Sequence, residues 1–321
     1  MKLVTFDTGD GVKRPGALVS DGTQIADLAA ASGGAVASVL WIAEGGDSAL
    51  AQAEEAAKSA TGDALVAVDS VRLHAPIQPP PQMRDCLCFE THLIQAFQQA
   101  RKLRAKQFDD PEAAERDMEK KGILSVPQTF YDQPIYYKAN RFAVVGHEHD
   151  VIWPSYSNFM DFELEFGVYI GKPAKDVKKE DARAHIFGYT IFNDVTARDA
   201  QTAEMGGSLG PAKGKDFDTA NPMGPCLVTA DEFGDPYDKT MICRVNGEEW
   251  GRGSTSTMYW SFEDLVAHIS ASETIHSGEF LGSGTVGNGC GLEQMRFLSP
   301  GDVVELEVEG IGILRNRIVK N

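Results

Sequence analysis

Apolar and polar positions change their spacing along the first third of the chain. Residues 2–6 and 16–19 are short apolar runs between glycine turns, which predicts two strands. Alanine-rich stretches at residues 36–43 and 50–60 predict helices. Prolines at 76–81 then interrupt any regular element, because proline removes a backbone donor and restricts its neighbour.

This proline-rich segment predicts a domain boundary. We expect a small N-terminal α+β cap over residues 1–75 and a larger domain over residues 76–321. Within the larger domain, residues 92–121 combine helix formers with many charges, which predicts an exposed helical excursion able to fold over a cleft.

Beyond this excursion the pattern becomes mainly β. Short runs rich in β-branched and aromatic residues alternate with Gly, Pro, Asn and Asp. The strands expected from these runs lie at residues 135–137, 144–145, 151–153, 162–170, 187–192, 226–228, 241–245 and 303–308. An α+β fold that is mainly β follows from this order of elements.

Composition excludes several classes of partner. The chain has 42% hydrophobic residues and no apolar run near the ~20 residues that span a bilayer. Its first ten residues lack the apolar stretch of a signal peptide, so we expect a soluble, cytoplasmic protein without a membrane partner. A net charge of −17 repels phosphate backbones and argues against a nucleic-acid partner.

The five cysteines are scattered and form no CxxC pair, which predicts reduced thiols rather than a disulfide framework or zinc site. Cys86 and Cys88 alternate along an apolar stretch and are interpreted as packing residues.

Three carboxylates alternate with apolar residues in one predicted strand. This spacing places Asp161, Glu163 and Glu165 on one face. The flanking aromatic residues indicate partial burial, where uncompensated carboxylates are costly. A bound cation would relieve their repulsion, and an ordinary acidic strand face is the alternative interpretation.

Asp194 ends another apolar strand and could supply a further carboxylate. Ligation by oxygen alone suits Mg²⁺, Mn²⁺ or Ca²⁺ and disfavours zinc. Asp85 and His92 flank a change from strand-like to helix-like sequence. Histidine is the commonest general base near neutral pH, and a structural histidine is the alternative at this position.

Two other motifs are rejected as binding sites. His147, Glu148 and His149 are consecutive, so they cannot all face one ion on a regular element, and we predict a turn there. The glycine-rich run at 282–287 matches a dinucleotide fingerprint by letter, but the following residues cannot continue a helix. We expect a flexible loop that brings Thr285 to a substrate.

With these residues in view, the chain from about Arg84 to Asn321 resembles the fumarylacetoacetate hydrolase family. The order of five motifs carries the resemblance: Asp85 with His92, Glu163 with Glu165, the Asn193, Asp194, Arg198 and Gln201 block, residues 215–219, and residues 282–285.

The resemblance implies a mixed β-sheet roll, usually assembled as a homodimer. It also implies a divalent metal ion, Mg²⁺ or Mn²⁺ with Ca²⁺ as another candidate. Its expected ligands are four carboxylates: Asp85, Glu163, Glu165 and Asp194.

The resemblance also implies catalytic roles. His92 falls where the family has its water-activating histidine, with Glu293, which we favour, or Glu90 as the acid that orients it. Arg198 and Lys215 match positions that stabilise developing negative charge. Residues matching substrate-binding positions are Gln201, Thr285, Asp218 and Thr219.

The function implied first is hydrolysis of a C–C bond in a 2,4-diketo acid resembling fumarylacetoacetate or an acylpyruvate, as in aromatic catabolism, by water activated at His92. The alternative within enzymology is a decarboxylase, tautomerase or dehydratase of 2-keto acids that uses the same metal–enolate site. A metal-binding protein without catalytic activity is the third hypothesis.

Overall fold

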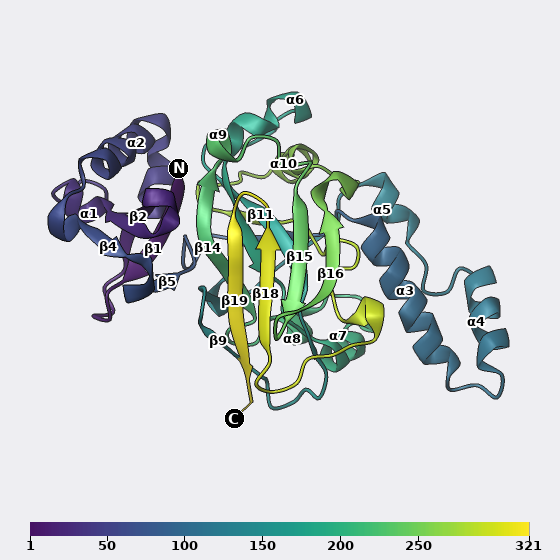
Figure 1. Ribbon diagram of the computed structural model, residues 1–321. Helices are drawn as coiled ribbons and strands as arrows, with labels where there is room; N and C mark the ends of the chain where they lie inside the picture. The colour runs from purple at the N-terminus through teal and green to yellow at the C-terminus, as the bar shows by residue number, and fades with distance from the viewer. Residues whose placement is uncertain (321) are drawn as a thin grey trace.

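Two β-sheets pack against each other in the computed structural model, which describes residues 1–320 (Figure 1). The larger sheet has the strand order β4-β3-β2-β1-β14-β12-β11-β17-β6-β7, with β5 beside β1 and β8 beside β14. The second sheet has the order β16-β15-β18-β19-β9, and a short pair joins β10 to β13. Because β17 and β6 run parallel whereas most neighbours are antiparallel, the larger sheet is mixed.

The strands have the following bounds: β1 Lys2–Asp7, β2 Arg14–Val19, β3 Gln24–Asp27, β4 Leu65–Ala67, β5 Arg72–His74, β6 Met83–Cys86, β7 Tyr136–Lys138, β8 Val144–Val145, β9 Asp150–Ile152, β10 Met160–Asp161, β11 Leu164–Ile170, β12 Ile186–Asn193, β13 Thr196–Ala197, β14 Asn221–Thr229, β15 Thr240–Val245, β16 Glu248–Ser254, β17 Phe280–Gly282, β18 Val303–Val308 and β19 Gly312–Val319.

The α-helices have the following bounds: α1 Leu28–Ala31, α2 Val39–Ser59, α3 Glu90–Ala105, α4 Pro111–Lys120, α5 Gln128–Asp132, α6 Lys179–Ala182, α7 Arg198–Met205, α8 Ala212–Lys215, α9 Ala230–Phe233 and α10 Phe262–Ser270. No helix within residues 1–320 is long and apolar enough to cross a membrane.

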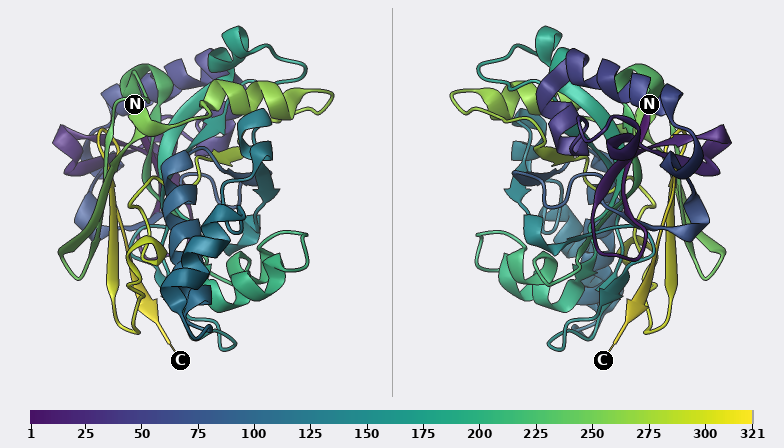
Figure 2. Two further views of the ribbon diagram at one scale, coloured as in Figure 1. Left: turned by 90° about the vertical axis from the view of Figure 1, so that its right-hand side faces the viewer. Right: turned by 90° about the vertical axis from the view of Figure 1, so that its left-hand side faces the viewer.

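The N-terminal segment forms a lobe at one side of the body, with α2 packed against strands β1 to β3 (Figures 1 and 2). The two predicted alanine-rich helices are both present within α2, as two helical segments separated by a kink at Gly46. Gly46 has φ of 58°, a conformation that costs glycine little. Strand β1 pairs with β14, so the lobe extends the larger sheet. The domain boundary after residue 75 stays a prediction.

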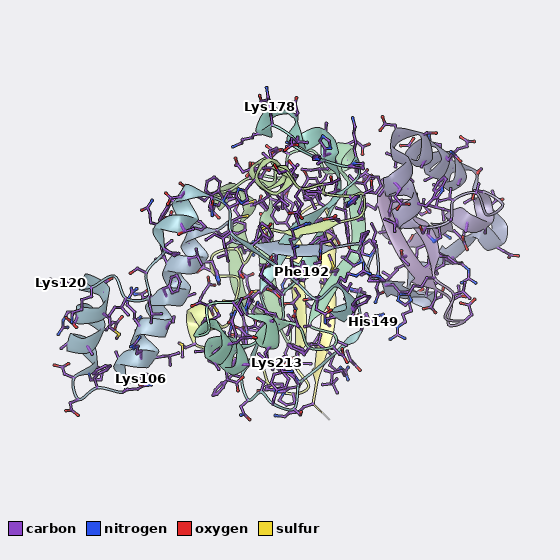
Figure 3. All side chains as sticks on the ribbon, turned by 180° about the vertical axis from the view of Figure 1, so that it is seen from behind. Lys106, Lys120, His149, Lys178, Phe192 and Lys213 are labelled. Carbon is purple, nitrogen blue, oxygen red and sulfur yellow. The ribbon has the colours of Figure 1, made fainter. Side chains whose placement is uncertain are left out.

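The predicted helical excursion is present as α3 and α4. Both project from the body on the side opposite the N-terminal lobe (Figure 1), and they face the viewer in the left view of Figure 2. Lys106 and Lys120 mark its outer part, far from Phe192 in the middle of the body (Figure 3). The first three turns of α3 lie near the core, where His92 and Gln99 contact Glu293 and Gln95 contacts Asn288.

The core lies between the two sheets. Phe166, Tyr189 and Phe262 are fully buried, and their rings contact one another at centroid distances of 5.0 to 6.5 Å. Buried residues of β18 and β19 in the second sheet belong to the same hydrophobic cluster: Val304, Leu306, Val308, Leu314 and Ile318. The α+β, mainly β fold expected from the sequence is confirmed.

A buried ion-pair group links β6 to the segment before β17. Arg84 is 2% exposed and donates hydrogen bonds to Glu279 and Glu273. We expect Arg84→Met to lower the free energy of unfolding by about 3–5 kcal/mol, because Glu279 is left buried without its counter-charge. Urea denaturation measures the loss.

The controls for this prediction are two variants. Adding Glu279→Gln to Arg84→Met should recover part of the stability. Arg252→Met breaks only an exposed pair with Glu249 and should cost less than about 1 kcal/mol. Equal losses for the buried and the exposed variant would contradict this account of Arg84.

Candidate active site

Three carboxylates meet where adjacent strands of the larger sheet end. Asp85 lies on β6, Glu165 lies on β11, and Asp194 directly follows β12. The strand order β12-β11-β17-β6 brings these positions together. Ligand oxygens of the three residues lie within 4.8 Å of one another, and all three side chains are buried.

The glycine-rich segment after β17 makes room for this cluster and donates to it. A Cβ at Gly282 would lie 2.4 Å from Asp85 Oδ1, so a larger residue would displace the carboxylate. The Gly284 amide donates to Glu165 Oε2 at 3.1 Å and to Asp85 Oδ1 at 3.3 Å. Thr285 donates its hydroxyl to Glu165 Oε1 at 3.3 Å.

Burial changes the charge state of these carboxylates. It raises the pKa of Asp85 to about 6 and that of Asp194 to about 8, although Lys215 opposes both shifts. It also raises the pKa of Glu165 well above its ordinary value, with the charges of Asp85 and Asp194 adding to the effect. Without a cation, the cluster therefore retains protons near neutral pH.

The cluster fits a hard divalent ion. Asp194 Oδ1 is buried and has no hydrogen-bond partner among residues 1–320. An unsatisfied carboxylate oxygen beside two further carboxylates offers the oxygen ligands that Mg²⁺, Mn²⁺ and Ca²⁺ prefer. Asp85, Glu165 and Asp194, three of the four expected ligands, are the residues that would hold it, and their role as ligands stays a prediction.

Glu163, the fourth expected ligand, has a different environment. Lys215 Nζ lies 2.6 Å from its Oε2, and Arg198 Nη1 lies 2.7 Å from its Oε1. Burial would raise the pKa of Glu163, but these two cations lower it below the ordinary range. Glu163 is outside the three-carboxylate group, so its role as a metal ligand stays a prediction.

The charge state of the cluster predicts a pH effect on stability. Acids whose pKa is raised on folding stabilise the protein at low pH, and this stability is lost as pH rises through the raised pKa. Three histidines have the opposite effect, because their pKa values are lowered on folding and the protein loses stability as they become protonated: His74, His147 and His149. This effect operates only below about pH 6.5. Metal-free protein should therefore lose on the order of 1–2 kcal/mol of unfolding free energy between about pH 6.5 and pH 8.

Urea denaturation at both pH values measures this loss. Saturating Mg²⁺ should reduce it, because a bound cation favours the ionised carboxylates. A metal-free protein that is equally stable at both pH values would show that the cluster is already ionised.

Lys215 and Arg198 provide the positive charge of the site. Lys215 Nζ lies 2.6 Å from Asp194 Oδ2 as well as from Glu163, and the side chain is 2% exposed. Arg198 Nε donates to Asp161 Oδ2 at 2.8 Å, and its Nη1 donates to Gln201 at 3.1 Å. Both cations lie where they can compensate negative charge that develops on a bound molecule.

Asp161 corrects one expectation from the sequence. It does not share a strand with Glu165, since it belongs to β10 whereas β11 begins at Leu164. The chain bends between them, where Glu163 forms an isolated bridge with Cys290. Asp161 instead accepts the amides of Gly291 and Leu292 and pairs with Arg198, so it orients that cation.

His92 and Glu293 form a buried pair beside this group. His92 lies in the first turn of α3, and its Nδ1 is 2.9 Å from Glu293 Oε1. Glu293 Oε2 accepts the amide of Cys290 at 3.1 Å, which fixes the carboxylate. Glu90, the other expected partner, instead accepts a hydrogen bond from Tyr131. The favoured partner, Glu293, is therefore the one that contacts His92.

Two of the expected substrate-binding residues, Asp218 and Thr219, have other environments. The Asp218 side chain is exposed, and the Thr219 hydroxyl accepts a hydrogen bond from the amide of Ile152 at 2.7 Å. Gln201 accepts from Arg198 and Thr285 lies in the carboxylate cluster. The substrate-binding roles of all four residues stay predictions.

Tyr137 and Cys290 were not anticipated as parts of this site. The Tyr137 hydroxyl donates to Asp194 Oδ2 at 2.8 Å, and burial together with Asp194 raises its pKa well above the ordinary value. Cys290 lies beside His92 and Glu293. Neither was accessible from the sequence, because each reaches the site through strand pairing or a loop rather than through a motif.

The two motifs that were rejected as binding sites have the backbone structure predicted for them. His147 and Glu148 lie in a turn, and no helix continues directly from the glycine-rich run at 282–287, since the next one is a single 3-10 turn at Leu292–Gln294. All five cysteines are free and buried, as expected for reduced thiols.

Comparison with known proteins defines the class. The fumarylacetoacetate (FAA) hydrolase C-terminal family matches residues 111–319. A Xenopus laevis protein named oxaloacetate tautomerase fahd2, mitochondrial, is 31% identical over 321 residues, covering 99% of this chain and 90% of that protein. This chain therefore belongs to the fumarylacetoacetate hydrolase family, as its motifs predicted. Members of this family are enzymes, and we conclude that this protein is an enzyme as well.

Further relatives agree with this assignment. The human oxaloacetate tautomerase FAHD2A, mitochondrial, is 39% identical over 188 residues, a match that spans 58% of this chain and only 59% of that protein. Among solved structures, a fumarylacetoacetate hydrolase from Exiguobacterium antarcticum has a TM-score of 0.75 at 26% identity, with both chains covered completely. A probable 2-hydroxyhepta-2,4-diene-1,7-dioate isomerase from Mycobacterium abscessus has a TM-score of 0.72 at 27% identity, covering 100% of this chain and 99% of that chain.

Proposed function

We propose that this protein is a divalent-metal-dependent tautomerase of small 2-keto acids, with oxaloacetate as its first candidate substrate. The observation that carries the proposal is the His92–Glu293 pair beside the Asp85, Glu165 and Asp194 cluster. This arrangement combines a base, His92, with charged groups that can stabilise an enolate. The tautomerase names of relatives that match over 99% and 58% of this chain favour isomerisation as the outcome.

His92 is suited to move a proton between carbon and oxygen. With Nδ1–H directed at the Glu293 carboxylate, Nε2 keeps its lone pair and can accept a proton from C3 of the keto acid. The C–H electron pair becomes the C2–C3 double bond, and the carbonyl oxygen becomes the enolate oxygen. Return of the proton to that oxygen gives the enol, and the reverse sequence gives the ketone.

The charged groups of the site support this transfer. Lys215 and Arg198 are buried cations that can compensate the negative charge of the enolate and of a substrate carboxylate. A divalent ion held by the carboxylate cluster would supply Lewis-acid stabilisation of the substrate's carbonyl oxygen. Because Glu293 is held by the Cys290 amide, the imidazole keeps its orientation during the proton transfer.

Hydrolysis of a C–C bond in a 2,4-diketo acid is the second candidate. The same base could take its proton from water rather than from carbon, and the structural similarity to the Exiguobacterium antarcticum hydrolase favours this possibility. Decarboxylation and dehydration of 2-keto acids use the same enolate, and product analysis separates them from tautomerisation.

An absorbance assay separates tautomerisation from hydrolysis. The enol form of oxaloacetate absorbs ultraviolet light, and this absorbance is lost as the enol converts to the ketone. The protein with Mg²⁺ should accelerate this decay far above the buffer rate. Acylpyruvate cleavage is followed in parallel by loss of the diketone absorbance. Rapid acylpyruvate cleavage without accelerated enol decay would replace the tautomerase by the hydrolase.

Assembly and location are proposals that rest on the family. We propose a homodimer, and light scattering at micromolar concentration should give twice the mass of 34.8 kDa. The vertebrate relatives are named mitochondrial, whereas the cytoplasmic location expected from this sequence stays a prediction.

A further inference from the structure

A second group of potential metal ligands has a different chemistry from the carboxylate cluster. It is connected to that cluster through Glu163, which forms a β-bridge with Cys290 and shares Lys215 with Asp194. Ligand atoms of His92, Cys290 and Glu293 lie within 4.8 Å of one another. The three residues are 8%, 1% and 7% exposed, respectively. They offer one nitrogen, one sulfur and one oxygen, whereas the carboxylate cluster offers oxygen alone.

The backbone holds Cys290 in this position from both sides. Its preceding residue, Gly289, accepts the amide of Leu164 at 2.9 Å, and the following Gly291 amide donates to Asp161 at 2.8 Å. The Cys290 amide donates to Glu293 at 3.1 Å. These bonds fix the backbone of Cys290 beside the histidine–glutamate pair, and the side chain is buried there.

We infer that His92, Cys290 and Glu293 form a second metal site, selective for thiophilic divalent ions of the Zn²⁺ class. Zinc prefers nitrogen and sulfur ligands at about 2.0–2.3 Å and commonly takes three protein ligands with one open position. A small contraction of the observed spacing gives such a set. Mg²⁺ does not compete well for it, because Mg²⁺ prefers oxygen ligands.

Occupation of this site blocks the proposed reaction. The ion takes the imidazole and carboxylate of the same pair that the proton transfer requires, and the thiol loses its proton on binding. Zn²⁺ therefore inhibits the enzyme while Mg²⁺ occupies the neighbouring cluster. This inhibition rests on the proposed function, but binding of the ion does not.

Cobalt(II) serves as the spectroscopic probe. With saturating Mg²⁺ present, Co²⁺ added to the full-length protein should produce a near-ultraviolet thiolate-to-cobalt charge-transfer band, which Zn²⁺ abolishes by displacement. Cys290→Ser should lose the band, whereas Cys226→Ser, a change at another buried thiol that lies outside the group, should keep it. Glu293→Gln, which retains the thiol, should require a higher Co²⁺ concentration.

The activity measurement uses each variant's own zinc-free rate as reference. Cys290→Ser should raise the Zn²⁺ concentration for half inhibition by at least about tenfold, because zinc binds a hydroxyl far less well than a thiolate. Relief of inhibition by extra Mg²⁺, or unchanged Co²⁺ binding by Cys290→Ser, would overturn the inference. A cobalt band in a protein that lacks tautomerase activity would support the second site and reject only the proposed function.

Discussion

His92→Ala should lower kcat by roughly 10²–10⁴-fold, the range for losing acid–base assistance, with a much smaller effect on KM. The reason is geometric, since Glu293 fixes one ring nitrogen and leaves the other available for proton transfer. The proposed metal ligands Asp85, Glu165 and Asp194 lie on other elements, so metal affinity should change little. Steady-state kinetics and calorimetry measure the two effects.

A matched control lies two residues away. Glu90 is on the same helix turn but contacts Tyr131, so Glu90→Gln should keep near wild-type kcat. A His92→Ala variant that melts several degrees lower yet turns over at the normal rate would identify His92 as a packing residue. A decarboxylase that needs no base would also survive this substitution, so product analysis accompanies the kinetics.

Removal of metal should abolish activity. Chelator-treated protein is expected to be inactive and to recover with Mg²⁺ or Mn²⁺, because the buried carboxylate cluster forms a hard-oxygen site. Glu165→Gln should weaken metal binding strongly, since the carboxylate oxygens of Glu165 face both Asp85 and the glycine loop. Calorimetric titration measures the change in affinity.

The comparison between two glutamates sharpens this test. Glu163→Gln removes a carboxylate that pairs with Lys215 and Arg198, so it should weaken metal binding less than Glu165→Gln does. A larger loss in Glu163→Gln would restore the ligand set implied by the family. Full activity after chelation would reject a metal-dependent mechanism altogether.

The sequence predicted the β-rich part of the fold because a strand with one buried face shows alternating apolar and polar residues. It failed for β17, which has three residues and ends at a glycine, and it indicated only the end of β6, whose four residues are all buried and include Arg84. Strand β19 alternates buried Leu314, Asn316 and Ile318 with exposed neighbours, but its arginines and asparagine hide the pattern.

The site was only partly readable for a similar reason. Asp85, His92 and Asp194 stand at element boundaries, where motif spacing is informative. The contacts of Glu163 depend on where Lys215 and Arg198 fold back, and their sequence separations of 52 and 35 residues give no local signal. Cys290 joins His92 through a loop, and only the tertiary structure brings them together.

Exchange of hydrogen for deuterium at C3 of the substrate tests the central claim most directly. Nuclear magnetic resonance of oxaloacetate in D₂O should record exchange well above the buffer rate with the protein and Mg²⁺. The enhancement should disappear with chelator and in His92→Ala, whereas Glu90→Gln should retain it. Exchange at the buffer rate in the presence of active, metal-loaded protein would contradict proton abstraction from carbon by His92.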